Sequence, residues 1–206
     1  MLHLKGLEYE VVEEPLRKWT KWMQEWSKET GERARIPVLR YWDDEGQEHI
    51  LPESNDIDFF LDAVDGNPEY TPVKNTASYE EMERWWNWCD EDMKPVIDLY
   101  KYGKDLQWDK DSNKYYTKVL RGYIKELEEH LENHTYLVEE RLTLADIAVI
   151  PFIRQIMRTR NGEFDFSDFP KVVAWANTIL ETDWFNEEVM KKQELAEIGP
   201  AYMGEQ

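Results

Sequence analysis

The sequence predicts a small α/β domain followed by a larger all-helical domain. β-forming and helix-forming runs alternate over roughly the first 66 residues, whereas the apolar residues beyond residue 76 recur at helical spacing. Between the two patterns, residues 66–76 contain Gly66-Asn67-Pro68 and Thr71-Pro72, which break both kinds of element. We therefore expect domains at residues 1–70 and 76–206.

The first domain should contain a strand, a helix, a hairpin and a second helix. Tyr9, Val11 and Val12 favour a strand, and the charged run at 13–28 favours a helix that Gly31 ends. The β-rich segment 36–42, turn residues at 43–46 and apolar alternation at 48–51 predict the hairpin. A helix over about 55–64 follows. This order matches the later part of a thioredoxin-like α/β domain.

The second domain should be built from long amphipathic helices. Ser78 and Glu81 have capping-box spacing, and a stripe of large apolar residues carries that helix to about Tyr102. After a polar loop at 103–112, a second helix should reach Leu131. Thr143 and Asp146 open a largely apolar, central helix at 144–158. Further helices are expected at 170–181 and 184–196, followed by a loose acidic tail after Gly199.

The composition excludes several classes of protein. The chain has 206 residues and a formal charge of -19, from 44 acidic and 25 basic residues, so it should repel nucleic acid and anionic lipid. Such a surface is typical of a soluble protein, with a basic partner as the alternative. A single cysteine, Cys89, fits a reducing compartment, and no apolar run is long enough to span a bilayer. Because Met1–Val12 also lacks the features of a secretory signal, we expect a cytoplasmic protein.

Several motifs together resemble the glutathione S-transferase family. Leu142–Ala148 resembles the capping box that opens the central C-terminal helix of that family, and Phe169-Pro170, Trp175 and Trp184-Phe185 are similar to the segment that follows. Ile36-Pro37-Val38 and Pro52-Glu53-Ser54 are similar to its glutathione clamp. The resemblance covers residues 4 to 190 and is strongest to bacterial-type and glutaredoxin-like members. It departs at Asp183, where the family usually has proline.

The resemblance implies a thioredoxin-like domain that is incomplete at its N-terminus, followed by a transferase-type helical domain. In the family, a first strand and helix carry the catalytic Tyr, Ser or Cys and precede the segment that Met1–Val12 resembles. The catalytic residue is therefore unknown, and Tyr41 or a residue of the helical domain would have to replace it. Met1–Gly6 itself reads like the end of a helix closed by Gly6, as if translation began upstream.

The same resemblance assigns glutathione-binding roles. The proline matching Pro37 is cis in the family and exposes the backbone of the residue matching Ile36, which pairs with the cysteinyl backbone of glutathione by strand addition. Ser54 and the helix after it would hold the γ-glutamyl carboxylate, and Glu53 would face the α-amino group. The alternatives are a trans proline on an edge strand and a serine that only caps its helix. Arg33 and Arg35 are candidates for the ligand carboxylates.

Other chemically suggestive residues have simpler readings. Trp85, Trp86 and Tyr100 lie on the first helix of the second domain, which lines the electrophile pocket in the family, although most such rings are core residues. His130 and His134 are four residues apart, as metal ligands can be, but no third ligand is evident, so we predict no metal site. Cys89 lies on the Trp-rich stripe and reads as a core thiol.

Two functions follow from these patterns. The first is a glutathione transferase-like enzyme that binds glutathione as co-substrate and conjugates it to a hydrophobic electrophile, or reduces disulfides. The second is a non-catalytic protein that keeps the fold for binding or as a scaffold, because an incomplete sheet leaves an edge that invites association. Whether the chain is an enzyme is left open. The family also implies a homodimer.

Overall fold

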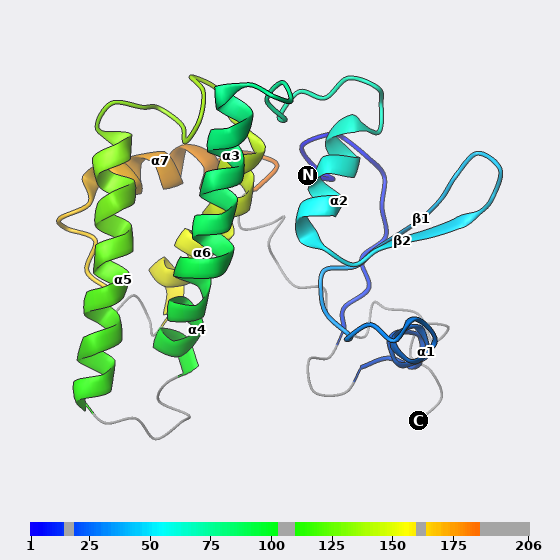
Figure 1. Ribbon diagram of the computed structural model, residues 1–206, viewed down its shortest axis with the longest axis horizontal. Coiled ribbons are helices and arrows are strands. Elements are labelled where there is room, and N and C mark those ends of the chain that lie inside the picture. Colours follow the sequence, from blue (N-terminus) through cyan, green and yellow to red (C-terminus); the bar gives the residue numbers. More distant parts are fainter. Residues whose placement is uncertain (15–18, 103–109, 160–163, 186–206) are drawn as a thin grey trace. The chain divides into compact units, whose positions relative to one another are not determined.

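The chain divides into two compact units, one built on Met1–Val64 and one on Asp65–Asp183. The computed structural model describes residues 1–14, 19–102, 110–159 and 164–185 (Figure 1). The helix expected at 184–196 and the tail after Gly199 lie almost wholly outside the described residues, as does most of the loop at 103–112. The first unit is an α/β structure and the second is all-helical, so the sequence-based fold class is confirmed.

The α/β unit contains two helices and a two-stranded antiparallel sheet in its described part. Its elements are α1 (Lys21–Thr30), β1 (Leu39–Trp42), β2 (Glu48–Leu51) and α2 (Ser54–Ala63). Leu39 pairs with Leu51 and Trp42 with Glu48, and the turn between the strands uses Gly46 at a positive φ of 77°. The hairpin and the second helix therefore form as the sequence predicted.

The N-terminal segment departs from expectation at two points. Residues 9–12 form no strand, and Tyr9, Val11 and Val12 are exposed, because a β-forming run needs a neighbouring strand to pair with and the described chain places none beside it. The first helix also begins later than residue 13: Thr20 caps it, and its hydroxyl accepts a hydrogen bond from Met23 N over 3.3 Å. Gly31 ends that helix with a φ of 73°, as predicted.

Residues 1–7 form a Schellman-type helix end. Leu7 N donates to Leu2 O over 3.0 Å and Gly6 N donates to His3 O over 3.1 Å, while Gly6 adopts a φ of 63°. The segment is tied to α2 by Lys5 Nζ, which donates to Asp62 O over 3.1 Å. The prediction that residues 1–6 resemble the end of a helix terminated by Gly6 is therefore confirmed.

Side chains of the two helices contact opposite sides of strand β1. Tyr41 of β1 stacks on Phe60 of α2 with ring centroids 4.3 Å apart, whereas the guanidinium of its neighbour Arg40 lies 5.6 Å from the ring of Trp22 on α1. Because successive side chains of a strand point to opposite faces, these contacts place α2 and α1 on different sides of β1.

The helical unit is an antiparallel arrangement of long helices (Figure 1). Its elements are α3 (Ala77–Asn87), the π-helix η1 (Trp88–Met93), α4 (Lys94–Tyr102), α5 (Lys110–Leu131), α6 (Leu144–Arg158) and α7 (Pro170–Leu180). α3 packs on α6, α4 packs on α5 and α6, and α7 packs on both α5 and α6. The apolar α6 therefore lies centrally, as its sequence indicated.

The helix expected to run from Ser78 to Tyr102 is continuous but differs in two details. Its N-cap is Thr76, whose hydroxyl accepts from Tyr79 N over 3.3 Å, so the predicted Ser78 capping box is wrong. Its middle, η1, is wound as a π-helix, which adds a residue to the turn and keeps Trp88, Cys89 and Met93 all on the buried side. Sequence spacing alone cannot reveal that wider turn.

A buried carboxylate joins three segments of the helical core. Asp146 is fully buried and accepts hydrogen bonds from Leu137 N and Thr143 N at 2.9 Å each, from Thr143 Oγ1 at 2.9 Å and from Trp175 Nε1 at 3.0 Å. Burial raises the pKa of Asp146, while these donors oppose the shift. The Thr143–Asp146 capping box thus also anchors the preceding loop and α7.

Among the described residues, no helix is long and apolar enough to cross a membrane.

Candidate functional site

The segment before β1 presents an exposed backbone edge. The Ile36–Pro37 peptide bond is cis, and the side chain of Ile36 is 50% exposed. Strand β1 pairs with β2 on one side only, and within the described chain no hydrogen bond engages the backbone of Ile36. The backbone N–H and C=O of Ile36 can therefore accept an extended, peptide-like ligand.

The start of α2 offers groups suited to a carboxylate. Glu53 is the N-cap residue and makes no side-chain cap, and Ser54 is the first helical residue and not the cap, so the reading of Ser54 as a capping serine is wrong. The Ser54 side chain is exposed, and among the described residues its hydroxyl has no hydrogen-bond partner. The positive end of the helix and this hydroxyl together favour an anion.

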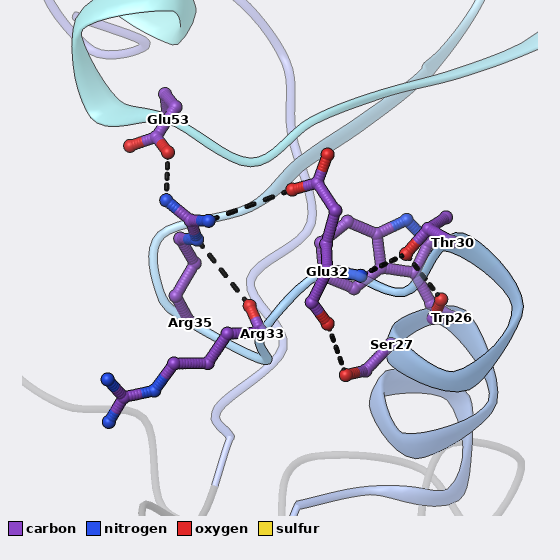
Figure 2. Close-up of polar contacts among 7 residues, drawn as sticks. All are labelled: Trp26, Ser27, Thr30, Glu32, Arg33, Arg35 and Glu53. Carbon is purple, nitrogen blue, oxygen red and sulfur yellow. Dashed lines mark hydrogen bonds and ion pairs between the residues drawn. The ribbon is translucent and has the colours of Figure 1, made fainter.

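An arginine links the two halves of this site, as Figure 2 shows. Arg35, next to Ile36, forms an ion pair with Glu53, lies 3.7 Å from Glu32 and donates from Nε to Arg33 O over 3.5 Å. Arg33 itself extends away from Glu53 in the same view (Figure 2). Arg35 therefore holds the segment before β1 close to the start of α2, a role that spacing along the chain did not show.

The Ser27 end of α1 supports this loop. The Ser27 hydroxyl donates to Glu32 O, and Glu32 N donates to the Thr30 hydroxyl over 3.2 Å (Figure 2). The Thr30 hydroxyl in turn donates to Trp26 O over 2.8 Å. The buried Trp26 thus anchors the loop that carries Glu32 and Arg35.

The aromatic residues considered for a substrate pocket lie in the helical core. Trp85 is fully buried and donates from Nε1 to Leu137 O over 3.0 Å, and Trp86 donates from Nε1 to Leu144 O over 3.1 Å. Tyr100 is 2% exposed and meets Phe164 edge to face at 6.4 Å. Packing and these hydrogen bonds account for the three side chains without a ligand.

The remaining titratable candidates are also structural. His130 and His134 stack at 4.5 Å, and His130 Nε2 lies 2.8 Å from Leu137 O, while burial lowers the pKa of His130. No three metal-binding side chains cluster within the described ranges. Cys89 is buried, and desolvation raises its thiol pKa, so it is not a poised nucleophile. Tyr41 is stacked between His49 and Phe60, with ring centroids 5.0 and 4.3 Å away.

Two surface grooves on the helical unit were not foreseen. One, of about 530 Å³, is lined mainly by acidic and polar residues of α3 and η1, namely Glu80, Glu83, Arg84, Asn87, Trp88 and Asp92. The other, of about 520 Å³, lies between α4 and the end of α6 and is lined by Lys101, Pro151, Arg154, Gln155, Arg158 and Thr159. The helical spacing of Arg154 and Arg158 is visible in the sequence, but the approach of Lys101 from another helix is not.

Comparisons with known proteins agree with this architecture. Residues 97–183 match the family described as glutathione S-transferase, C-terminal domain. A glutathione S-transferase-like protein LUC7 from Fusarium is 26% identical over 154 residues, which cover 73% of this chain and 70% of that protein. The chain also superposes on solved glutathione transferases at low identity, which shows a shared fold.

Several of these solved structures contain bound glutathione, and two are given as examples. Glutathione transferase URE2P6 from Phanerochaete chrysosporium, in complex with oxidised glutathione, has a TM-score of 0.75 at 20% identity over 92% of this chain and 86% of that one. A glutathione transferase from Burkholderia graminis, with two glutathione molecules bound per subunit, has a TM-score of 0.76 at 20% identity over 94% and 82% of the two chains.

Proposed function

We propose that this chain, which belongs to the glutathione S-transferase family, binds reduced glutathione along Ile36-Pro37 and at the start of α2. The proposal is supported by two features of the α/β unit: within the part of the chain that the structure describes, no hydrogen bond engages the backbone of Ile36, and the Ser54 hydroxyl has no hydrogen-bond partner. Glutathione is the ligand of solved proteins with the same fold, which supports the choice among peptide-like anions.

The cysteinyl part of glutathione would extend the sheet at Ile36. An extended peptide that adds to a strand edge gains main-chain hydrogen bonds, and the neighbouring side chains set its register. The N–H and C=O of Ile36 supply one donor and one acceptor for this pairing. The exposed side chain of Ile36 would then be covered by the ligand.

The γ-glutamyl end would lie at the start of α2. Its carboxylate would accept hydrogen bonds from the Ser54 hydroxyl and from the free amides of the first turn, while its ammonium group would pair with the Glu53 carboxylate. Arg35 forms an ion pair with Glu53 in the structure. On binding, Arg35 would exchange Glu53 for a carboxylate of glutathione, so that its charge stays paired.

The reaction proposed for the bound thiol is transfer to an electrophile or to a disulfide. A thiolate is the reactive form, so catalysis requires a group that lowers the pKa of the glutathione thiol. Such a group also has to lie within hydrogen-bond distance of the sulfur. None of the described residues is assigned this role, and the catalytic residue remains unknown.

A second candidate is binding of glutathione without turnover. It is favoured by the state of the two side chains that could otherwise act on a thiol. Cys89 is buried with a raised pKa, and the Tyr41 ring is stacked between His49 and Phe60. In this case the same clamp would serve recognition or assembly, including the homodimer that the family resemblance suggests.

Calorimetric titration of the full chain with reduced glutathione tests the proposal. We expect saturable binding that Ser54→Ala weakens by about tenfold, which is the effect of losing one charge-assisted hydrogen bond. Ser167→Ala, an exposed serine of the helical unit, is the matched control and should bind like the parent chain. No binding at millimolar glutathione by a folded chain would refute the proposal.

Turnover assays then separate the two candidates. If glutathione binds, consumption of 1-chloro-2,4-dinitrobenzene or of a small disulfide at a rate above the uncatalysed reaction identifies an enzyme. Binding with no such rate for either co-substrate identifies the recognition function. Activity that survives Ser54→Ala without loss would place glutathione elsewhere.

A further inference from the structure

Arg35 lies between two carboxylates that belong to different segments of the α/β unit (Figure 2). Its Nη1 pairs with Glu53, the N-cap residue of α2, and its Nη2 lies 3.7 Å from a carboxylate oxygen of Glu32 in the loop after α1. The three side chains are between 41% and 52% exposed, so a ligand can reach them. One guanidinium group therefore contacts two acceptors through different nitrogen atoms.

The loop after α1 fixes the position of Glu32. The Ser27 hydroxyl donates to Glu32 O, and Glu32 N donates to the Thr30 hydroxyl over 3.2 Å. These contacts use only the main chain of Glu32, and its carboxylate faces Arg35 (Figure 2). Glu53 makes no side-chain cap at the start of α2, and its carboxylate pairs with Arg35 instead.

A ligand ammonium group would compete with Arg35 for Glu53, because both cations need the same carboxylate. A guanidinium that is displaced without a new partner loses an exposed ion pair, and such a pair shifts an equilibrium by up to about fivefold. Glu32 reduces this loss, since its carboxylate already lies 3.7 Å from Nη2 and keeps the guanidinium paired. The ease of displacement therefore depends on Glu32.

We propose that Arg35 is a latch with two positions, one on Glu53 and one on Glu32, that selects ligands with a zwitterionic end. A ligand ammonium that takes Glu53 leaves Arg35 on Glu32, where the freed Nη1 can meet a ligand carboxylate. An end that carries only one of these charges completes only half of the exchange. The latch rests on the proposed binding of glutathione and adds a positioning role for Glu32, which does not touch the ligand.

Calorimetric titration of the full-length Glu32→Gln variant with reduced glutathione tests the latch. We expect the affinity to fall by about threefold, because the displaced guanidinium loses its second partner. Loss of a negative charge alone would have the opposite sign, since it favours binding of an anionic peptide. The matched control is Glu29→Gln, which removes the same charge from an exposed position at the end of α1 and should not weaken binding.

A second ligand separates the latch from a general change in the loop. Glutathione acetylated on the α-amino group of its γ-glutamyl residue has no ammonium group and cannot compete for Glu53. Its affinity should therefore not fall in Glu32→Gln. Urea unfolding of Glu32→Gln should match that of Glu29→Gln, because the main-chain contacts of Glu32 with Ser27 and Thr30 are kept.

A double-mutant cycle tests whether Glu32 acts through Arg35. In the Arg35→Gln background, Glu32→Gln should no longer weaken glutathione binding, because there is no guanidinium left to hold. If Arg35→Gln no longer binds glutathione measurably, the comparison of the free and acetylated ligands in Glu32→Gln decides the question.

Three results would overturn the latch: unchanged or tighter glutathione binding by Glu32→Gln, equal weakening for the free and acetylated ligands, or equal weakening in the Arg35→Gln background. Each of them leaves the proposed function standing, because glutathione still binds the parent chain and binds more weakly after Ser54→Ala. Absence of glutathione binding by the folded parent chain would instead refute the proposed function, and the latch with it.

Discussion

Replacing Asp146 should destabilise the helical unit more than any surface substitution. The carboxylate accepts from three N–H groups, those of Leu137, Thr143 and Trp175, and from the Thr143 hydroxyl. Asp146→Ala leaves the three N–H donors without an acceptor in the core, and at about 1–3 kcal/mol each the loss is ~3–6 kcal/mol if the site relaxes in part. That is a large share of the ~5–15 kcal/mol by which folded domains are stable.

Asp146→Asn separates the geometry of the site from its charge. One amide oxygen can still accept from Leu137 and Trp175, but the amide nitrogen then faces Thr143 N, so we expect a smaller loss of about 1–3 kcal/mol. Urea unfolding followed by circular dichroism at 222 nm measures both variants. The exposed Asp98→Asn on α4 is the control and should stay within about 0.5 kcal/mol of the parent chain.

The ranking of these variants decides the reasoning. A loss below about 1 kcal/mol for Asp146→Ala would mean that the buried donors find other acceptors, and the network would not be what holds the loop, α6 and α7 together. If Asp146→Ala does not fold, Asp146→Asn and Thr143→Val still test the account. Both should fold and unfold at lower urea than the Asp98→Asn control.

Three further outcomes are expected. Glu128 accepts from Lys171 N at 3.0 Å and Val172 N at 2.8 Å at the start of α7, so Glu128→Ala should cost about 1 kcal/mol in urea unfolding, against no comparable loss for its exposed neighbour Glu129→Ala. Burial, with Asp62 nearby, raises the pKa of Asp58 to about 6. Protonation of Asp58 therefore stabilises the fold fully below about pH 4, and this contribution is lost as the pH rises through 6. Asp58→Asn should raise the melting temperature at pH 8 but not at pH 4, and a lower melting temperature at pH 8 would contradict this. Because Cys89 is buried with a raised thiol pKa, iodoacetamide should label it at pH 8 only after unfolding, as measured by mass spectrometry.

Capping and turn residues in the sequence predicted those helix ends and turns that depend only on neighbouring residues. Gly31 ends α1 because a left-handed residue is needed there, and Thr143 begins α6 because its side chain and that of Asp146 satisfy the first turn. The hairpin followed from turn residues between two β-rich runs. The strand predicted at Tyr9–Val12 is absent from the structure, because a strand needs a partner strand elsewhere in the chain.

The candidate site was predictable in part, for the same reason. Ile36-Pro37 and Glu53-Ser54 were identified by a family pattern, and the structure describes Ser54 as the first residue of α2 instead of its cap. The ion pair of Arg35 with Glu53 and the convergence of Lys101 with Arg154 join residues 18 and 53 positions apart. Such contacts arise from packing between elements, and periodicity along one element carries no information about them.

The central claim is that glutathione binds at the segment before β1 and at the start of α2. A titration of the ¹⁵N-labelled full chain with reduced glutathione, followed by amide chemical shifts, tests it most directly. The account predicts saturable shifts at Ile36, Ser54 and Asn55, with the helical core around Asp146 unchanged. Shifts confined to the groove of Arg154 and Arg158, or no shifts at millimolar glutathione, would contradict it.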